Sequence, residues 1–173
     1  MRISQEIEIT PTSVIRNGIP VEVQQTGDKM LVELYRRFAG DYPKFFKMDT
    51  LCRLGFIAAE LLLQNEKADA VILANRSASI KNDKDYMATI SGGQYYPSPA
   101  LFVYTLPNIV TGEIAIRHHI QGETSFYILD NPDELEPIIR SSFSPQTSAI
   151  LAGWCECSAS NEFYAKIQII WNN

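Results

Sequence analysis

The chain has 173 residues, 46% of them hydrophobic, and a formal net charge of −5 from 15 basic and 20 acidic side chains. A chain of this length can bury a substantial core, and we expect residues 1–173 to form a single domain. The acidic balance argues against general nucleic-acid binding, which normally needs a basic excess. No apolar run approaches the ~20 residues that a membrane span needs.

The N-terminus and the cysteine content indicate the cellular compartment in which the protein is expected. The first residues alternate polar and apolar side chains and lack the apolar core of a secretory signal. The sequence has three cysteines, and an odd number does not favour a disulfide framework. We therefore expect a cytoplasmic protein without a membrane span.

The first seventy-five residues alternate strand and helix patterns. Residues 3–9 predict a first strand, paired with a short second one around Val14-Ile15. Apolar residues at helical spacing predict a helix over residues 28–38. Asp49 is a good N-cap for a second helix, whose apolar stripe is small in its middle and therefore able to pack closely. Residues 70–74 are continuously apolar, as in strands covered on both faces.

Residues 75–96 are polar and contain Ser91-Gly92-Gly93, which predicts a long loop with one helical turn around residues 83–87. Loops of this length in compact domains are usually functional or interfacial. The stretch from Pro97 to Gly122 follows. It predicts a proline-set turn, a short apolar segment and a helix that starts near Pro107 and stops at Gly122.

The last part of the chain predicts a strand over residues 124–129 and a short helix over residues 133–140, opened by Asp130-Asn131-Pro132. Strands over residues 148–154 and 163–171 follow, antiparallel to each other. Buried strands that alternate with helices predict an α/β fold with a mostly parallel sheet and an antiparallel edge.

Several motifs occur in order between residues 45 and 154. They are Phe46-Lys47-Met48-Asp49, Ser98-Pro99-Ala100-Leu101-Phe102, Thr105-Leu106-Pro107-Asn108, Gly112-Glu113-Ile114-Ala115-Ile116 and Gly122. Together they resemble the N-terminal half of the β-ketoacyl-acyl-carrier-protein synthases. The resemblance implies a thiolase-like half, with a mostly parallel, mixed, five-stranded sheet and helices on both faces. It covers only the first half of a full synthase, so we expect a truncated protein.

The position of the family's nucleophile is occupied by another residue. In the family, a catalytic cysteine stands at the start of a buried helix, where the helix dipole lowers its pKa. Counted from Gly122, that position falls at Asn131, and no cysteine lies between Cys52 and Cys155. An amide cannot replace a thiolate, and the family's two catalytic histidines belong to the half that is absent here. The resemblance therefore implies a protein that is not catalytic by itself.

A local basic cluster lies in this acidic chain. Its members, interleaved with aromatic residues, are Arg36, Arg37, Lys44, Lys47 and Arg53. Because family members bind an acidic acyl carrier protein, the resemblance implies a docking site for one. The alternative is an ordinary solvated helix face whose aromatic neighbours belong to the core.

A second candidate surface is the strand that contains Ser125, Phe126, Tyr127 and Ile128. These residues match the strand that, in family members, pairs with its mate across the dimer axis. The alternative is an ordinary core strand. The resemblance thus implies a homodimer or heterodimer.

The remaining candidates for metal or redox chemistry are better explained as structural residues. His118 and His119 are adjacent, and neighbours on a helix point about 100° apart, so they cannot easily share a metal ion. Cys155 and Cys157 are spaced to face one side of a strand, and their spacing matches no zinc signature. We expect no metal and no cofactor.

The sequence leaves three hypotheses open. The first is a truncated, condensing-enzyme-like protein of fatty-acid or polyketide biosynthesis that binds an acyl carrier protein or pairs with an active synthase. The second is an acyl-thioester decarboxylase or hydrolase that uses the Asn131 turn or a cysteine. The third is a purely structural, homodimeric interaction protein.

Overall fold

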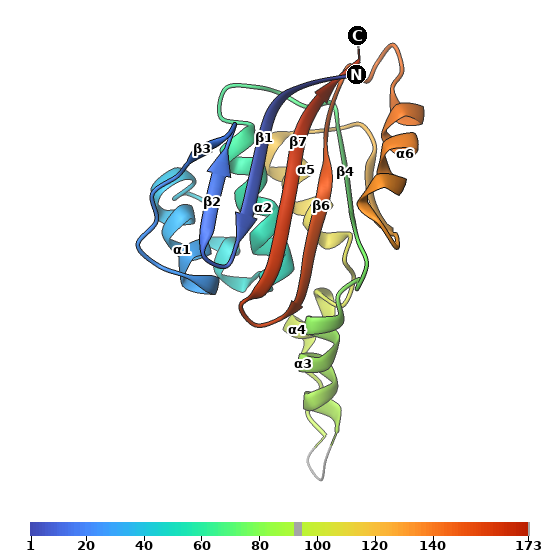
Figure 1. Cartoon of the computed structure of the whole chain (residues 1–173). Helices are drawn as coiled ribbons and strands as arrows, with labels where there is room; N and C mark the ends of the chain where they lie inside the picture. The colour runs from blue at the N-terminus through green and yellow to red at the C-terminus, as the bar shows by residue number, and fades with distance from the viewer. Residues whose placement is uncertain (92–94, 173) are drawn as a thin grey trace.

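A mixed sheet of seven strands, in the order β3-β2-β1-β7-β6-β4-β5, forms the centre of this computed structural model, which describes residues 1–91 and 95–172 (Figure 1). The strands are β1 (Arg2–Thr10), β2 (Ser13–Arg16), β3 (Ile19–Pro20), β4 (Ala70–Asn75), β5 (Thr124–Ile128), β6 (Ala149–Ala159) and β7 (Glu162–Trp171). The helices are α1 (Gly27–Phe38), α2 (Thr50–Leu62), α3 (Ile80–Ile90), α4 (Pro99–Val103), α5 (Ile109–His118) and α6 (Leu135–Ser142). Two 3-10 turns, η1 (Pro43–Lys47) and η2 (Pro132–Glu134), precede α2 and α6.

The sheet confirms the expected mixed α/β architecture but has two strands more than the five expected. β6, β4 and β5 are parallel, whereas β6–β7, β7–β1, β1–β2 and β2–β3 are antiparallel. Antiparallel pairs therefore outnumber parallel ones. The difference arises because the N-terminal strands add to the antiparallel edge at β7 through tight turns, and tight turns produce antiparallel neighbours.

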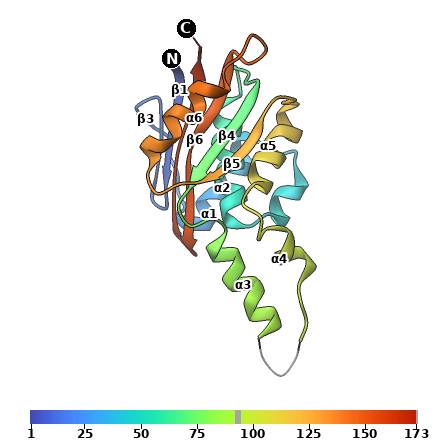
Figure 2. The same cartoon turned by 90° about the vertical axis from the view of Figure 1, so that its right-hand side faces the viewer.

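Helices cover both faces of the sheet, as expected. α1, α2 and α5 pack on one face, where they enclose the larger core cluster together with β1, β6 and β7. α6 lies alone on the other face, over a smaller cluster formed with β4 and β6 (Figures 1 and 2). Over β1 and the middle of β7 this second face is polar, with Glu6 3.6 Å from Lys166. One short helix therefore covers the apolar part of that face.

Helix α2 is the centre of the larger cluster, and all but one of its residues are buried. Its cap is the expected one, since the Asp49 carboxylate accepts a hydrogen bond of 3.0 Å from the Cys52 backbone N–H. A Cβ on Gly55 would lie 2.4 Å from a methyl group of Val110 on α5. The small residue therefore permits the close packing that the sequence predicted.

The segment after β4 differs from the expected loop. α3 spans eleven residues where only one helical turn was expected. Together with α4 it forms a helical arm that projects from one end of the sheet (Figures 1 and 2). The prediction failed because the polar surface of α3 hides its helical period. Gly92 and Gly93 of the expected turn lie outside the described residues.

The end of α5 also differs from the expectation. The helix ends at His118 rather than at Gly122, and the next residue, His119, caps it in the left-handed conformation with φ of 56°. Gly122 has another role, because a Cβ there would lie 2.2 Å from the backbone oxygen of Asp69. The glycine allows the turn before β5 to approach the turn before β4.

Candidate functional site

The turn that contains Asn131, the residue expected at the nucleophile position, lies directly between β5 and the helical segment η2–α6. Asn131 is exposed, and its backbone N–H donates a hydrogen bond of 3.0 Å to the Glu134 carboxylate. Its side-chain amide donates to the same oxygen at 3.3 Å. Pro132 follows as the first residue of η2, where its missing N–H costs nothing. The structure thus gives Asn131 the geometry of a helix cap.

All three cysteines are buried, in surroundings that suppress their reactivity. Cys52 on α2 and both cysteines of β6 are buried in the larger cluster, whereas α6 packs against the smaller cluster on the other face. Burial raises the pKa of Cys157 to about 12 and raises the pKa of Cys52 and of Cys155 well above the ordinary value. None of these thiols supplies a thiolate at neutral pH, because the thiolate is the reactive form. The burial of the thiols therefore argues against the hypothesis of hydrolysis through a cysteine.

Polar groups gather beside the Asn131 turn, at the carboxyl ends of the parallel strands. The Arg76 backbone N–H donates to Glu156 at 2.9 Å, and the Ser77 hydroxyl donates to the same carboxylate. Arg76 also lies 4.0 Å from Asp130, although the two side chains are 73% and 83% exposed. This end of a sheet is where α/β proteins bind ligands. The groups form an open rim there, without the enclosure that acid–base chemistry on a thioester requires.

A cavity of about 440 Å³ lies next to the turn, between α6 and the second face of the sheet. Pro132 and Asp133 stand at its edge, and most of its lining is apolar, including Leu135, Ile139, Trp154, Tyr164 and Ile170. The cavity is large enough for a small ligand. Most of the lining residues provide apolar contacts for a ligand rather than groups that could act in catalysis.

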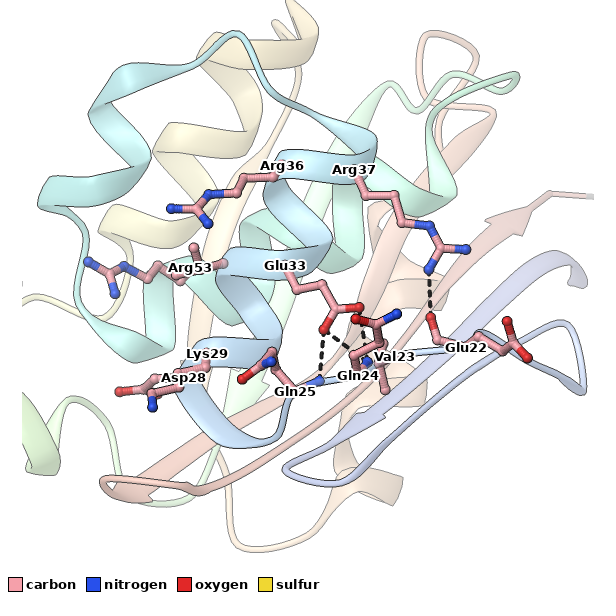
Figure 3. A pocket seen from close by; sticks show the side chains of 11 residues that line it. Glu22, Val23, Gln24, Gln25, Asp28, Lys29, Glu33, Arg36, Arg37 and Arg53 are labelled. Atoms are coloured by element: carbon pink, nitrogen blue, oxygen red, sulfur yellow. Dashed lines mark hydrogen bonds between the residues drawn. The ribbon is translucent and has the colours of Figure 1, made fainter.

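The three arginines of the basic cluster line an open groove of about 1160 Å³ between α1, the start of α2 and the segment after β3 (Figure 3). Arg36 and Arg53 point to the same side of the groove, whereas Arg37 turns away and donates a hydrogen bond of 2.6 Å to the Glu22 carbonyl. Arg53 is held in place by hydrogen bonds to the carbonyls of Phe45 and Phe46 at 3.2 and 2.9 Å. Two guanidinium groups are thus presented together.

The two lysines of the cluster are in different positions. Lys44 forms an ion pair with Glu113, a carboxylate that is only 6% exposed, and so points toward α5. Lys47 is exposed and lines a smaller cavity of about 230 Å³ next to Arg53. Within the described residues, Arg36, Arg53 and Lys47 form no ion pair with an acidic side chain. The aromatic neighbours Tyr35 and Phe45 are buried and stack at 4.2 Å, as the alternative explanation expected of them.

The candidate pairing strand is the last strand at one edge of the sheet. β5 pairs only with β4, so its other edge is without a strand neighbour among the described residues. Its sequence, Thr124-Ser125-Phe126-Tyr127-Ile128, contains no charge, no proline and no glycine. Natural proteins normally protect exposed edges with such residues. The edge is therefore chemically open to another strand.

The two histidines have structural surroundings. His118 Nε2 lies 2.9 Å from the Glu60 carboxylate, which also accepts a hydrogen bond of 2.9 Å from Arg117. Burial alone would raise the pKa of Glu60, but the bonds from His118 and Arg117 outweigh it and lower that pKa. No group of three potential metal ligands occurs within residues 1–91 and 95–172. Among the same residues, no helix is long and apolar enough to cross a membrane.

No protein-family model matches the sequence, and no curated protein sequence resembles it significantly. Solved structures do resemble the fold. One is the complex of the ketosynthase ApeO with its chain length factor ApeC from Xenorhabdus doucetiae, with a TM-score of 0.65 and 11% identity over 99% of this chain and 79% of that one. Another is the ishigamide ketosynthase/chain length factor, with a TM-score of 0.71 and 15% identity over 98% of this chain and 61% of that one. The chain therefore has the thiolase-like fold of ketosynthase-type proteins.

Proposed function

We propose that this chain is a non-catalytic, ketosynthase-like subunit of polyketide or fatty-acid biosynthesis that pairs with an active synthase. The observation that supports this most is the Asn131 turn. A ketosynthase-like fold brings β5 to the start of a helix, yet the residue there is a capping amide and every thiol is buried on the opposite face. Such a fold retains its binding surfaces without the nucleophile.

The likeness to solved structures is consistent with a partner role. Both structures are of a ketosynthase with a chain length factor. The first of the matched chains is only modestly longer than this one, since this chain spans 79% of it. In the proposal, this chain takes the place of a partner that completes a synthase without performing the condensation.

The proposed pairing surface is the edge of β5. A partner strand would satisfy the free backbone groups of Ser125 to Ile128 and continue the sheet into the second subunit. The strand is uncharged, so no like-charge repulsion opposes pairing with a similar strand. The half-exposed Ile128 side chain, 52% exposed, would be covered in the pair.

The proposed docking site for an acidic acyl carrier protein is the groove wall with Arg36 and Arg53, extended by Lys47 in the neighbouring smaller cavity. Arg53 contributes most to this proposal, because its guanidinium is already oriented by two backbone carbonyls and by the Phe45 ring at 5.5 Å. Preorganised groups lose less entropy on binding. Arg37 turns toward Glu22, and Lys44 is engaged by Glu113, so both contribute less.

Affinity purification of the tagged chain from its native cells tests the pairing. We expect an active ketosynthase to co-purify, and Ile128→Lys to abolish its recovery. Ile19→Lys is the matched control, because Ile19 is 69% exposed at the opposite edge of the sheet. Absence of any thiolase-like chain, or its equal recovery with Ile128→Lys, would contradict the proposal.

Carrier-protein docking has a separate test. We expect Arg53→Gln to weaken binding of the acyl carrier protein about 5-fold, a loss of about 1 kcal/mol, and the loss to shrink at high salt. Arg140→Gln on α6 is the matched control, since it removes an exposed arginine on the other face of the sheet. Equal binding by the wild type and Arg53→Gln would remove the groove from the proposal.

A decarboxylase that uses the Asn131 turn is the second candidate. The exposed Arg76 guanidinium beside Asp130 favours it, because decarboxylation needs a cation or donor to stabilise an enolate rather than a thiolate. It predicts release of carbon dioxide from malonyl-carrier protein, with strong loss in Arg76→Ala. If the purified chain releases no carbon dioxide, the decarboxylase candidate is excluded and only the partner role remains.

A further inference from the structure

A cavity lies between α6 and the second face of the sheet, and a small residue on β6 leaves room for it. Side chains two apart on a strand share a face, so Ile150, Ala152 and Trp154 all face α6, where they belong to the smaller cluster. Ala152 stands between two bulky neighbours and carries only a methyl group. The space above that methyl group is part of a cavity of about 440 Å³, which we call the α6 cavity.

The α6 cavity extends across three strands. β1, β7 and β6 lie side by side in the sheet, and they contribute Ile3, Ile170 and Trp154 to the lining. Neighbouring strands are about 4.8 Å apart, so the cavity spans about 10 Å across the sheet. These dimensions suit a small molecule.

The interior of the α6 cavity is apolar. Its side chains are at most 9% exposed, and these are Leu135, Ile139, Ala152, Trp154 and Ile170. Water is held poorly in such a place, because it needs several polar partners. A ligand that displaces poorly held water with apolar groups gains affinity. Because the apolar side chains are hidden rather than spread over an exposed patch, the cavity favours a small molecule over a protein surface.

The charged residues at the mouth of the α6 cavity determine which kind of molecule fits. Lys166 lies 3.6 Å from Glu6, and Glu136 lies 2.7 Å from Arg140. Asp133 takes part in no ion pair among the described residues. The mouth therefore offers no free cation to a carboxylate or a phosphate, and a bound anion would face an acidic side chain. A buried anion without a partner is costly, so the charges favour an uncharged ligand.

We propose that the α6 cavity binds an uncharged apolar small molecule, such as an aliphatic chain with a neutral end. The cavity is separate from the arginine groove, which lies beside α1 on the other side of the sheet, and no residue of β5 lines it. The inference therefore does not depend on the proposed pairing or docking surfaces, and it stands or falls on ligand binding by the purified chain.

Tryptophan fluorescence tests the site. The chain has two tryptophans, of which Trp154 lines the cavity, whereas Trp171 packs against the larger cluster. In a Trp171→Phe background the emission reports on Trp154 alone. We expect octanol to shift this emission saturably. Octanoate, which has the same chain length and a negative charge, should bind about 10-fold more weakly.

Two variants fill the α6 cavity from opposite sides. Ala152→Leu fills it from the sheet and Ile139→Phe fills it from α6, so each should abolish the shift caused by octanol. Thermal melts show whether each variant folds, and the second keeps the test valid if the first is overpacked. Ala88→Leu is the matched control, because Ala88 is exposed on α3 and outside the lining. It should bind octanol like the parent.

The outcomes that would overturn the inference are distinct. Absence of a saturable shift with octanol would show that the α6 cavity takes no apolar ligand. Equal affinity for octanoate would contradict the preference for an uncharged molecule. Unchanged binding of octanol by a folded Ala152→Leu or Ile139→Phe chain would mean that the ligand sits elsewhere. A concentration-dependent shift of the Trp154 emission without octanol, matched by dimers in sedimentation, would identify a second copy of the chain as the occupant instead.

Discussion

Helices α2 and α3 are similar in length, with 13 and 11 residues, but have opposite surroundings. α2 buries twelve of its residues between the sheet, α1 and α5, whereas α3 buries only Asn82. The first helix is fixed by packing inside the subunit. The second has exposed apolar residues that find no partner within the described residues. The subunit is therefore closed by its own packing around α2, whereas apolar or unpaired surface is left open at the arm and at β5.

The largest expected effect is at the centre of α2. Leu54 is fully buried, so Leu54→Ala should lower the free energy of unfolding by about 2–5 kcal/mol through lost contacts and a residual cavity. Urea unfolding followed by circular dichroism measures the change. A loss below 1 kcal/mol would mean that α2 does not have the packing described.

A close contact between helices gives the next effect. A Cβ on Gly55 would lie 2.4 Å from Val110, so Gly55→Ala should destabilise the fold by about 1–3 kcal/mol. Gly112→Ala on α5 is the matched control, because nothing lies within 4 Å of that Cβ. The control should be neutral or gain roughly 0.5–1 kcal/mol from helix propensity. Equal unfolding midpoints for the two variants would refute the close packing.

The cap of α2 predicts a pH dependence. Burial raises the pKa of Asp49 to about 6, above about 3.9 in unfolded chains. The folded state therefore binds this proton more tightly, and its contribution to stability is full below pH 4 and is lost as the pH rises toward 6. Asp49→Asn keeps a capping side chain without the charge, so it should gain about 1–2 kcal/mol at pH 7 and nothing at pH 3. Thermal melts across this range measure the difference, and a constant gap would contradict the assignment.

The smallest expected effect is on the arm. Met87 is 53% exposed on α3, so Met87→Ala should change the free energy of unfolding of the isolated chain by no more than about 0.5 kcal/mol. The same urea series as for Leu54→Ala provides the comparison. A loss of several kcal/mol would show that the arm packs within the subunit, and it would contradict the difference from α2.

The sequence predicted those elements whose signal is local. The buried run of β4, the Asp49 cap and the antiparallel pairing of β6 with β7 were all expected and are confirmed. The helical arm was missed, because α3 has no apolar stripe facing a core and its period is therefore invisible. The missing signal was compositional, namely the uncharged stretch from Tyr86 to Gly112.

The candidate site shows a similar division. Sequence counting predicted that Asn131 begins a helical segment after a strand, and the structure has it there. It could not predict that Lys44 is paired with Glu113, which is 69 residues away in the chain. Charge clusters read from sequence include every cation in a segment, whereas ion pairs depend on helix packing. The docking and pairing roles themselves remain predictions.

The proposed function requires that this chain does not catalyse condensation by itself. The direct measurement is an assay of the purified chain with malonyl- and acyl-carrier protein, read by mass spectrometry of the carrier-bound product. We expect no condensation product, both for the wild type and for Asn131→Ala. Robust condensation by the chain alone, undiminished in Asn131→Ala, would contradict it.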